Sequence, residues 1–197
     1  MGKKIHLLTF VLLFRFAFGI LERMYYEYNG VVYDKITRKL IRDNLDISLY
    51  QEPYDCAGYA IGDTAFSFYT DAMWHRIIYA RAVEPDSEIK YAKDYGTWGS
   101  GVRQFNSPRG IAIDSEHYIY IADTDNSRIV KLRLQADTLD WIGVIGLGIL
   151  QHPYDLEIEG NKLYVIDAGL HKVVRFSLSG AYQLSYGGYG FTEGKFN

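Results

Sequence analysis

The feature that most constrains this chain is a nine-residue motif that occurs three times. Each copy opens with an aspartate and ends in a short apolar, basic run. The copies read DAMWHRIIY, DTDNSRIVK and DAGLHKVVR, at residues 71–79, 123–131 and 167–175. An apolar run precedes each copy, and further upstream lies a proline: Pro53, Pro108 and Pro153. Self-similarity at a period of about 40–50 residues is typical of solenoids and propellers.

The middle copy belongs to a unit that predicts four short strands. Alternating apolar residues favour strands at 110–114, 118–122, 128–134 and 140–145, with the turn cluster DTDNS at 123–127. The same order recurs at 155–187 and 55–95 and more weakly at 20–50, and helical spacing is absent. Four antiparallel strands per repeat make one propeller blade. We therefore predict an all-β propeller with blades at about 20–50, 51–95, 108–145 and 153–187.

The last residues repeat an earlier connection. YGGYGFTEGKFN at 186–197 aligns with YGTWGSGVRQFN at 95–106, which leads into a new blade. We therefore expect residues 188–197 to start a further blade and the chain to be a fragment of a longer protein.

The N-terminus predicts export. Lys3 and Lys4 precede the apolar run 5–14, and the small residues Ala17 and Gly19 follow. This order indicates a signal peptide at 1–19 and a secreted, periplasmic or cell-surface protein, although Arg15 interrupts the apolar run. A buried strand or helix is the alternative. A membrane anchor needs about 20 apolar residues, so we expect no membrane span after the leader is removed.

Charge and cysteine content exclude two classes of protein. The chain has 21 basic and 24 acidic residues, and loss of the leader leaves a net charge of about −6. Such a chain lacks the basic surface of nucleic-acid binders, so we expect no nucleic-acid partner. The lone Cys56 has no partner for an internal disulfide, and its apolar surroundings predict an inert buried thiol.

The repeated aspartates, Asp71, Asp123 and Asp167, are predicted to be structural. An aspartate that opens a turn accepts hydrogen bonds from backbone N–H groups two residues on, and a catalytic group is needed once rather than once per blade. The basic residues that follow, Arg76, Arg128 and Lys172, should pair with these aspartates or lie along the sheet. The five histidines do not converge, so we expect no catalytic residue, no metal site and no cofactor.

The unit at 95–134 resembles the NHL repeat. The resemblance is carried by the pattern GxGxxxFxxPxGIAID followed by IYIADTDNSRIVKL, which begins at Gly99 and includes Phe105, Pro108 and Asn126. It implies a six-bladed ring, of which this chain would supply about four blades. NHL-like amidating lyases bind a metal through histidines. A metal-dependent propeller enzyme, amidating-lyase-like or a lactone hydrolase, is therefore the alternative function.

Two loops of each blade should emerge on one face of such a propeller. One set joins successive blades at 96–109, 146–154 and 187–197, and the other joins the second and third strands at 71–75, 123–127 and 167–171. Aromatic residues and arginine dominate binding surfaces. We predict ligand contacts on this face from a set of five residues: Trp98, Arg103, Arg109, Asn126 and Tyr154. The leading prediction is a non-catalytic module that binds a protein, peptide or glycan; the repeated Phe105 and Phe196 should be wedges between blades.

Overall fold

The computed structural model describes residues 53–83 and 88–196. The predicted leader at 1–19 and the predicted blade at 20–50 lie outside the described residues. Within this part of the chain there is no α-helix, so the all-β prediction is confirmed. No helix there has the length and apolar character that a membrane crossing requires.

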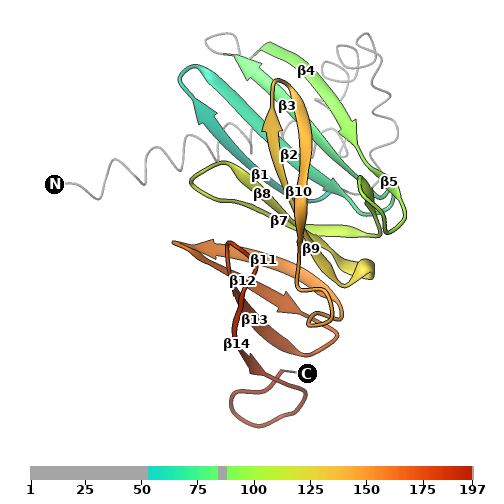
Figure 1. The fold of residues 1–197 in the computed structure, drawn as a ribbon, viewed down its shortest axis with the longest axis vertical. Coiled ribbons are helices and arrows are strands. Elements are labelled where there is room, and N and C mark those ends of the chain that lie inside the picture. The colour runs from blue at the N-terminus through green and yellow to red at the C-terminus, as the bar shows by residue number, and fades with distance from the viewer. Residues whose placement is uncertain (1–52, 84–87, 197) are drawn as a thin grey trace, which may run out of the picture. The chain divides into compact units, whose positions relative to one another are not determined.

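Three four-stranded sheets, each made of consecutive strands, account for most of the described chain (Figure 1). The first holds β1 (Pro53–Ile61), β2 (Thr64–Asp71), β3 (Arg76–Val83) and β4 (Glu88–Tyr95). The second holds β7 (Pro108–Ile113), β8 (Tyr118–Asp123), β9 (Arg128–Gln135) and β10 (Thr138–Ile145). The third holds β11 (Pro153–Glu159), β12 (Lys162–Asp167), β13 (Lys172–Ser177) and β14 (Tyr182–Gly187). The predicted strands lie within two residues of these bounds.

Two short features, a parallel pair of two-residue strands and a 3₁₀ turn, were not predicted from the sequence. Residues 97–98 (β5, Thr97–Trp98) and 104–105 (β6, Gln104–Phe105) pair in parallel inside the connection between the first two sheets. The turn after β8 contains a single 3₁₀ turn, η2 (Thr124–Asn126), which ends at Ser127 with a left-handed backbone. Both elements are too short to give a periodic pattern of apolar residues.

The three prolines occupy equivalent places. Each is the first residue of the first strand of its sheet. Pro108 pairs in register with Asp123, and Pro153 pairs with Asp167. A register shift follows each of these two prolines, as expected where a residue without an N–H enters a ladder. The repeat seen in the sequence is therefore a repeat of backbone geometry.

The chain divides into two compact units. The described part of the first comprises Ala57–Phe68, 78–83 and 88–93, where Phe68 stacks on Tyr79. The second comprises 53–56, Tyr69–Ile77 and 94–196. The residues of the candidate site described below all belong to this second unit.

The second and third sheets share one apolar core within the second unit. Tyr120, Ala122 and Ile129 of the second sheet pack with a matching set from the third: Leu156, Leu163, Val165, Val174 and Phe176. Side chains alternate along a strand, so every second residue of β8 and β12 faces this core. Strand β8 is also buried on its other face through Ile119 and Ile121, which explains why its sequence is apolar throughout.

Candidate functional site

The three repeated aspartates end strands β2, β8 and β12, and all are buried. Asp71 accepts a hydrogen bond from the N–H of Trp74, and Asp167 accepts one from Leu170. The donors therefore lie three residues on, rather than the two that the turn pattern predicts. Asp167 also accepts the N–H groups of Gln151 and His152, which belong to the preceding connection. Asp167 thus ties its turn to the connection before it.

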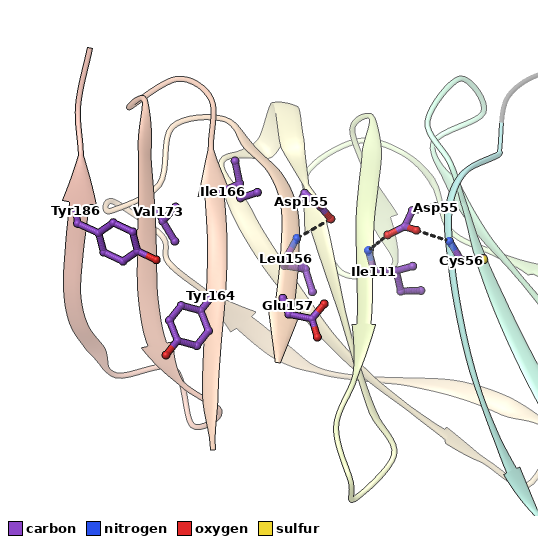
Figure 2. A pocket seen from close by; sticks show the side chains of 10 residues that line it. All are labelled: Asp55, Cys56, Ile111, Asp155, Leu156, Glu157, Tyr164, Ile166, Val173 and Tyr186. Carbon is purple, nitrogen blue, oxygen red and sulfur yellow. Dashed lines mark hydrogen bonds between the residues drawn. The ribbon is translucent and has the colours of Figure 1, made fainter. Parts of the chain in front are cut away.

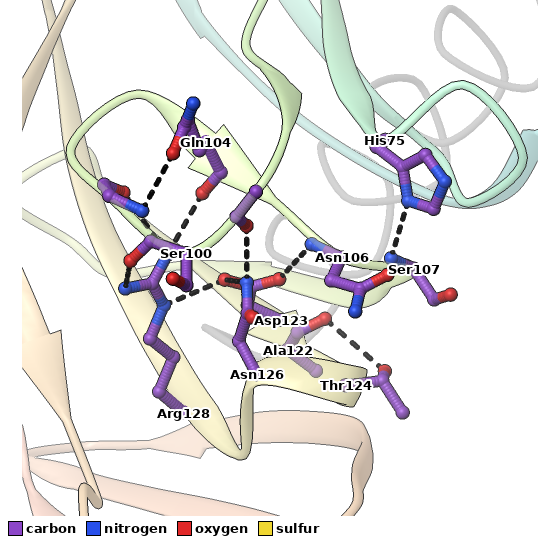
Figure 3. Close-up of polar contacts among 12 residues, drawn as sticks. His75, Ser100, Gln104, Asn106, Ser107, Ala122, Asp123, Thr124, Asn126 and Arg128 are labelled. Atoms are coloured by element: carbon purple, nitrogen blue, oxygen red, sulfur yellow. Dashed lines mark hydrogen bonds and ion pairs between the residues drawn. The ribbon is translucent and has the colours of Figure 1, made fainter.

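Asp123 accepts three donors, as Asp167 does, but one of its donors is a charged guanidinium (Figure 3). It accepts the backbone N–H of Asn106 at 2.6 Å, the Asn126 amide at 2.9 Å and Arg128 Nε at 2.7 Å. Burial raises the pKa of the Asp123 carboxyl, and these donors oppose the rise. Arg128 also donates to the carbonyl oxygens of Ser100, Gly101 and Gln104. A structural role accounts for every one of these contacts.

The predicted pairing of basic residues with the aspartates is confirmed for two of three. Arg76 Nε lies 3.2 Å from Asp71, and Arg128 Nε lies 2.7 Å from Asp123. Lys172 stands opposite Asp167 in the strand register.

The two aligned connections adopt the same backbone geometry. Gly99 N–H donates to the Phe105 carbonyl, and Gly190 N–H donates to the Phe196 carbonyl, each at 3.0 Å. Gly96 and Gly187 both have φ +104, and a Cβ at either would lie 2.5 Å from the Phe105 or Phe196 ring. Phe105 is fully buried, as the wedge prediction requires, whereas Phe196 is 43% exposed.

Three residues from equivalent positions meet where the first strands of the three sheets begin. Tyr54, Arg109 and Tyr154 each follow the repeated proline. The Arg109 guanidinium carbon lies 5.1 Å from the centre of the Tyr54 ring and 4.5 Å from the centre of the Tyr154 ring. The two rings meet edge to face at 5.4 Å. We call these three residues the tyrosine–arginine cluster.

Arg109 has unused hydrogen-bonding capacity. Its Nε is buried, and among the described residues it has neither a hydrogen-bond acceptor nor a carboxylate paired with it. Arg76 and Arg128, by contrast, are paired with aspartates. A buried donor without a partner costs about 1–3 kcal/mol, and because this atom is closed to solvent a ligand would have to bind the guanidinium through its other nitrogen atoms.

The predicted ligand residues separate into two groups. Arg109 and Tyr154 lie together in the cluster, whereas Trp98 is 68% exposed in the neighbouring connection. Arg103 lies over the Tyr95 ring at 4.9 Å. Asn126 uses its amide to donate to Asp123 and to the Gly99 carbonyl, so its contacts hold the loop in place.

Sequence analysis missed Tyr54. Its position after Pro53 is the same as that of Arg109 after Pro108 and Tyr154 after Pro153, and this alignment could have identified it. Burial raises the pKa of the Tyr54 phenol, the Tyr154 hydroxyl adds to the rise, and Arg109 opposes it. Tyr54 is therefore a neutral hydroxyl donor at physiological pH.

The histidines and the cysteine occupy separate environments. His75 Nδ1 accepts the Ser107 N–H at 2.9 Å, and His152 Nε2 lies 3.5 Å from Asp125. Within the described residues, no three His, Cys, Asp or Glu side chains are placed to hold a metal ion. Burial raises the pKa of the Cys56 thiol to about 11, which keeps it protonated and weakly reactive.

A hollow of about 470 Å³ lies beside the first strands (Figure 2). Asp55, Asp155 and Glu157 line one part of it, and Tyr164, Ile166, Val173 and Tyr186 line the other. Tyr164, Ile166 and Val173 align with Tyr120, Ala122 and Ile129, which the next sheet covers completely. This second part therefore corresponds to the face through which the second sheet packs on the third, and we do not assign a ligand to it.

The acidic part of the hollow begins one residue beyond the tyrosine–arginine cluster. Asp55 accepts the N–H groups of Ile111 and Cys56 at 2.9 and 2.8 Å (Figure 2). Burial raises the pKa of the Asp55 carboxyl; these two N–H groups oppose the rise, and the nearby Asp155 and Glu157 add to it. The positive charge of Arg109 thus lies at the start of the first strands, and the carboxylates of Asp55, Asp155 and Glu157 lie further along them.

Comparison with known proteins identifies the repeat. The sequence pattern of the NHL repeat matches residues 105–132. The chain contains an NHL repeat. The matched residues hold Phe105, Pro108, Asp123 and Arg128, so the NHL pattern and the buried ion pair coincide. The curated protein sequences contain no significant match.

One solved structure supports the propeller fold, and two others are similar to the chain at lower TM-scores. Hydrazine synthase from Kuenenia stuttgartiensis superposes with a TM-score of 0.50 at 13% identity, covering 73% of this chain and 36% of that one. Virginiamycin B lyase from Staphylococcus aureus gives a TM-score of 0.47 at 14% identity, covering 66% of this chain and 39% of that one. A putative 6-phosphogluconolactonase from Bacteroides uniformis gives a TM-score of 0.46 at 16% identity, covering 65% of this chain and 40% of that one. The chain is an NHL-type β-propeller of four-stranded blades, and it spans well under half of these structures.

Proposed function

We propose that this NHL chain is an exported, non-catalytic module that binds a protein, peptide or glycan. The tyrosine–arginine cluster carries the proposal, because it brings together residues 54, 109 and 154 from the first strands of three successive sheets and leaves a buried Arg109 donor without a partner among the described residues. Tyrosine and arginine are the residue types that contribute most to binding energy at interfaces.

The loops around the cluster supply the rest of the surface. Ser127 Oγ donates to the Gln151 carbonyl, and Ser107 Oγ donates to Asp125. The turn 123–127 is therefore bonded to the connections before and after its own sheet. Large apolar side chains are exposed on these loops: Trp74, Trp98, Val102, Leu147 and Tyr189. Binding energy at such a surface would come from apolar and aromatic contacts rather than from covalent chemistry.

Export is part of this proposal and rests on the leader-like residues 1–19. N-terminal sequencing of the protein recovered from the culture medium tests it. A mature chain that retains Met1 would contradict export and leave the binding site unaffected.

The binding proposal is tested by replacing Trp98, Arg109 and Tyr154 together with alanine. A random peptide library on phage and a glycan array serve as probes. We expect the wild-type chain to select ligands and the triple variant to lose at least about tenfold in affinity, since loss of interface aromatic and arginine side chains costs about 1–3 kcal/mol or more.

The matched control replaces three exposed residues near the opposite ends of the strands, Glu116, Lys162 and Tyr182. This variant should bind as the wild type does, and circular dichroism should show both variants folded. Undiminished binding by the triple variant would contradict the proposal. Stoichiometric zinc or calcium in the purified protein would instead favour the metal-dependent enzyme.

A further inference from the structure

We infer that Arg109 binds a carboxylate of an acidic peptide segment; this inference rests on the proposed function and specifies its ligand. The first step concerns geometry. Tyrosine rings lie near the guanidinium at 5.1 and 4.5 Å and its Nε is closed to solvent, so a ligand would reach the group through its terminal N–H donors. In-plane, two-point contact is the geometry in which arginine binds a carboxylate.

The second step concerns charge. Arg109 has no carboxylate partner among the described residues, and its Nε lacks any acceptor there, whereas the arginines that stabilise the turns are both paired. The Tyr54 hydroxyl already forms hydrogen bonds with Tyr154 and Arg109, so it does not need a ligand acceptor. An anionic acceptor would satisfy the guanidinium, and a cationic or purely apolar ligand would not.

The third step concerns position. The carboxylates of Asp55, Asp155 and Glu157 line the strands beyond the cluster, and mutual repulsion contributes to the raised pKa of Asp55. An anion is therefore repelled from the hollow. Its favourable place is at the strand ends, in contact with Arg109.

The fourth step selects a peptide over an acidic sugar. The connections next to the cluster expose aliphatic side chains: Val102 at 68%, Leu147 at 61% and Ile149 at 39%. Aliphatic side chains bury apolar surface of a protein and offer nothing to sugar hydroxyls. The favoured ligand is an acidic side chain, or a C-terminal carboxylate, flanked by apolar residues.

The test follows the Nε–Hε resonance of Arg109 by NMR in the full chain. The probes are N-acetyl-Leu-Glu-Leu-amide, its Gln counterpart, N-acetyl-Leu-Gln-Leu with a free C-terminus, and methyl glucuronide. We expect the two carboxylate peptides to shift this resonance and to bind roughly 10- to 100-fold more tightly than the neutral one, because a hydrogen bond to a charged group contributes about 1.5–3 kcal/mol. Whichever of these two peptides binds more tightly identifies an acidic side chain or a C-terminus as the source of the carboxylate in the natural ligand.

Two substitutions provide the controls. The Arg109 resonance should be missing from the spectrum of Arg109→Lys, which assigns it. The same variant should lose the preference for the Glu peptide over the Gln peptide, because lysine cannot make the planar two-point contact. Arg175→Lys is matched to it, since Arg175 also lies near a tyrosine ring with its Nε unpaired among the described residues, and it should leave the preference intact.

Equal binding of the Glu and Gln peptides, or no shift with any carboxylate, would overturn the inference. A stronger response to methyl glucuronide would overturn the choice of a peptide. Binding of library peptides or glycans that depends on Trp98 and Tyr154 but shows no carboxylate preference would refute this inference alone and leave the proposed function standing.

Discussion

Single aspartates decide how the turns of this protein are held. Asp123 is fully buried and accepts three donors, one of them the guanidinium of Arg128, whose side chain is also almost fully buried. Because Arg128 reaches three carbonyl oxygens of the preceding connection, the ion pair couples the turn 123–127 to residues 100–104. The repeated aspartate serves this coupling at Asp123 and Asp167.

Asp123→Ala should therefore destabilise the fold by roughly 3–5 kcal/mol, since it leaves a buried guanidinium without its counter-charge. Chemical denaturation monitored by tryptophan fluorescence measures the effect. Asp125→Ala is the control: this neighbour is partly exposed, and its loss should cost less than about 1 kcal/mol. Equal losses for the two variants would show that the buried ion pair is not the stabilising contact.

Close approach of two first strands explains the glycine of the NHL pattern in strand β7. A Cβ on Gly110 would lie 2.7 Å from the Asp155 Cα atom and 2.8 Å from Asp155 Oδ1. The nearest atom is backbone, which cannot rotate away. Strands β7 and β11 can lie this close only because residue 110 has no side chain.

Gly110→Ala should destabilise the fold by about 1–3 kcal/mol through overpacking. Thermal unfolding followed by circular dichroism checks the value. Gly143→Ala in strand β10 is a suitable comparison, because a Cβ there meets nothing within 4 Å. We expect that change to be neutral or slightly stabilising; a Gly110→Ala protein as stable as Gly143→Ala would contradict the packing described.

Neighbouring sheets of this molecule are not independent. The side chains of Tyr120 and Ile129 from the second sheet and of Leu163 and Phe176 from the third lie in one core. Repeat proteins gain much of their stability from such interfaces between neighbours. Loss of packing in one sheet should therefore be felt in the other.

Phe176→Ala should cost about 3–5 kcal/mol and should also weaken the second sheet. Hydrogen exchange detected by mass spectrometry tests this: the amides of β8 should lose protection although the substitution is in β13. A matched change on the uncovered face, Ile166→Ala, removes a half-exposed side chain and should leave β8 unchanged. Faster exchange confined to β11–β14 in the Phe176 variant would refute the coupling.

Local patterns in the sequence were sufficient to predict the strands and the repeat. Alternation of apolar residues, the repeated prolines and turn residues act over a few positions, so they can be read without a structure. The pairing of Arg76 with Asp71 and of Arg128 with Asp123 was also predictable, because five residues across one turn bring the side chains together.

The candidate site could be predicted only in part. Arg109 and Tyr154 were chosen as aromatic and basic residues of one face, but their contact with each other and with Tyr54 joins residues 45 to 100 positions apart. The use of Asn126 inside the loop, the parallel pairing of β5 with β6 and the donors three residues beyond Asp71 and Asp167 likewise follow from how segments meet.

The order of residues thus determined what each blade is made of, since strand formation and turn chemistry depend on neighbours along the chain. Only the tertiary structure decided that Arg109 lies close to Tyr54 and Tyr154 with its Nε buried and without an acceptor among the described residues. That outcome depends on the distances between side chains of different blades, and electrostatic and hydrogen-bonding energies change steeply over those few ångströms.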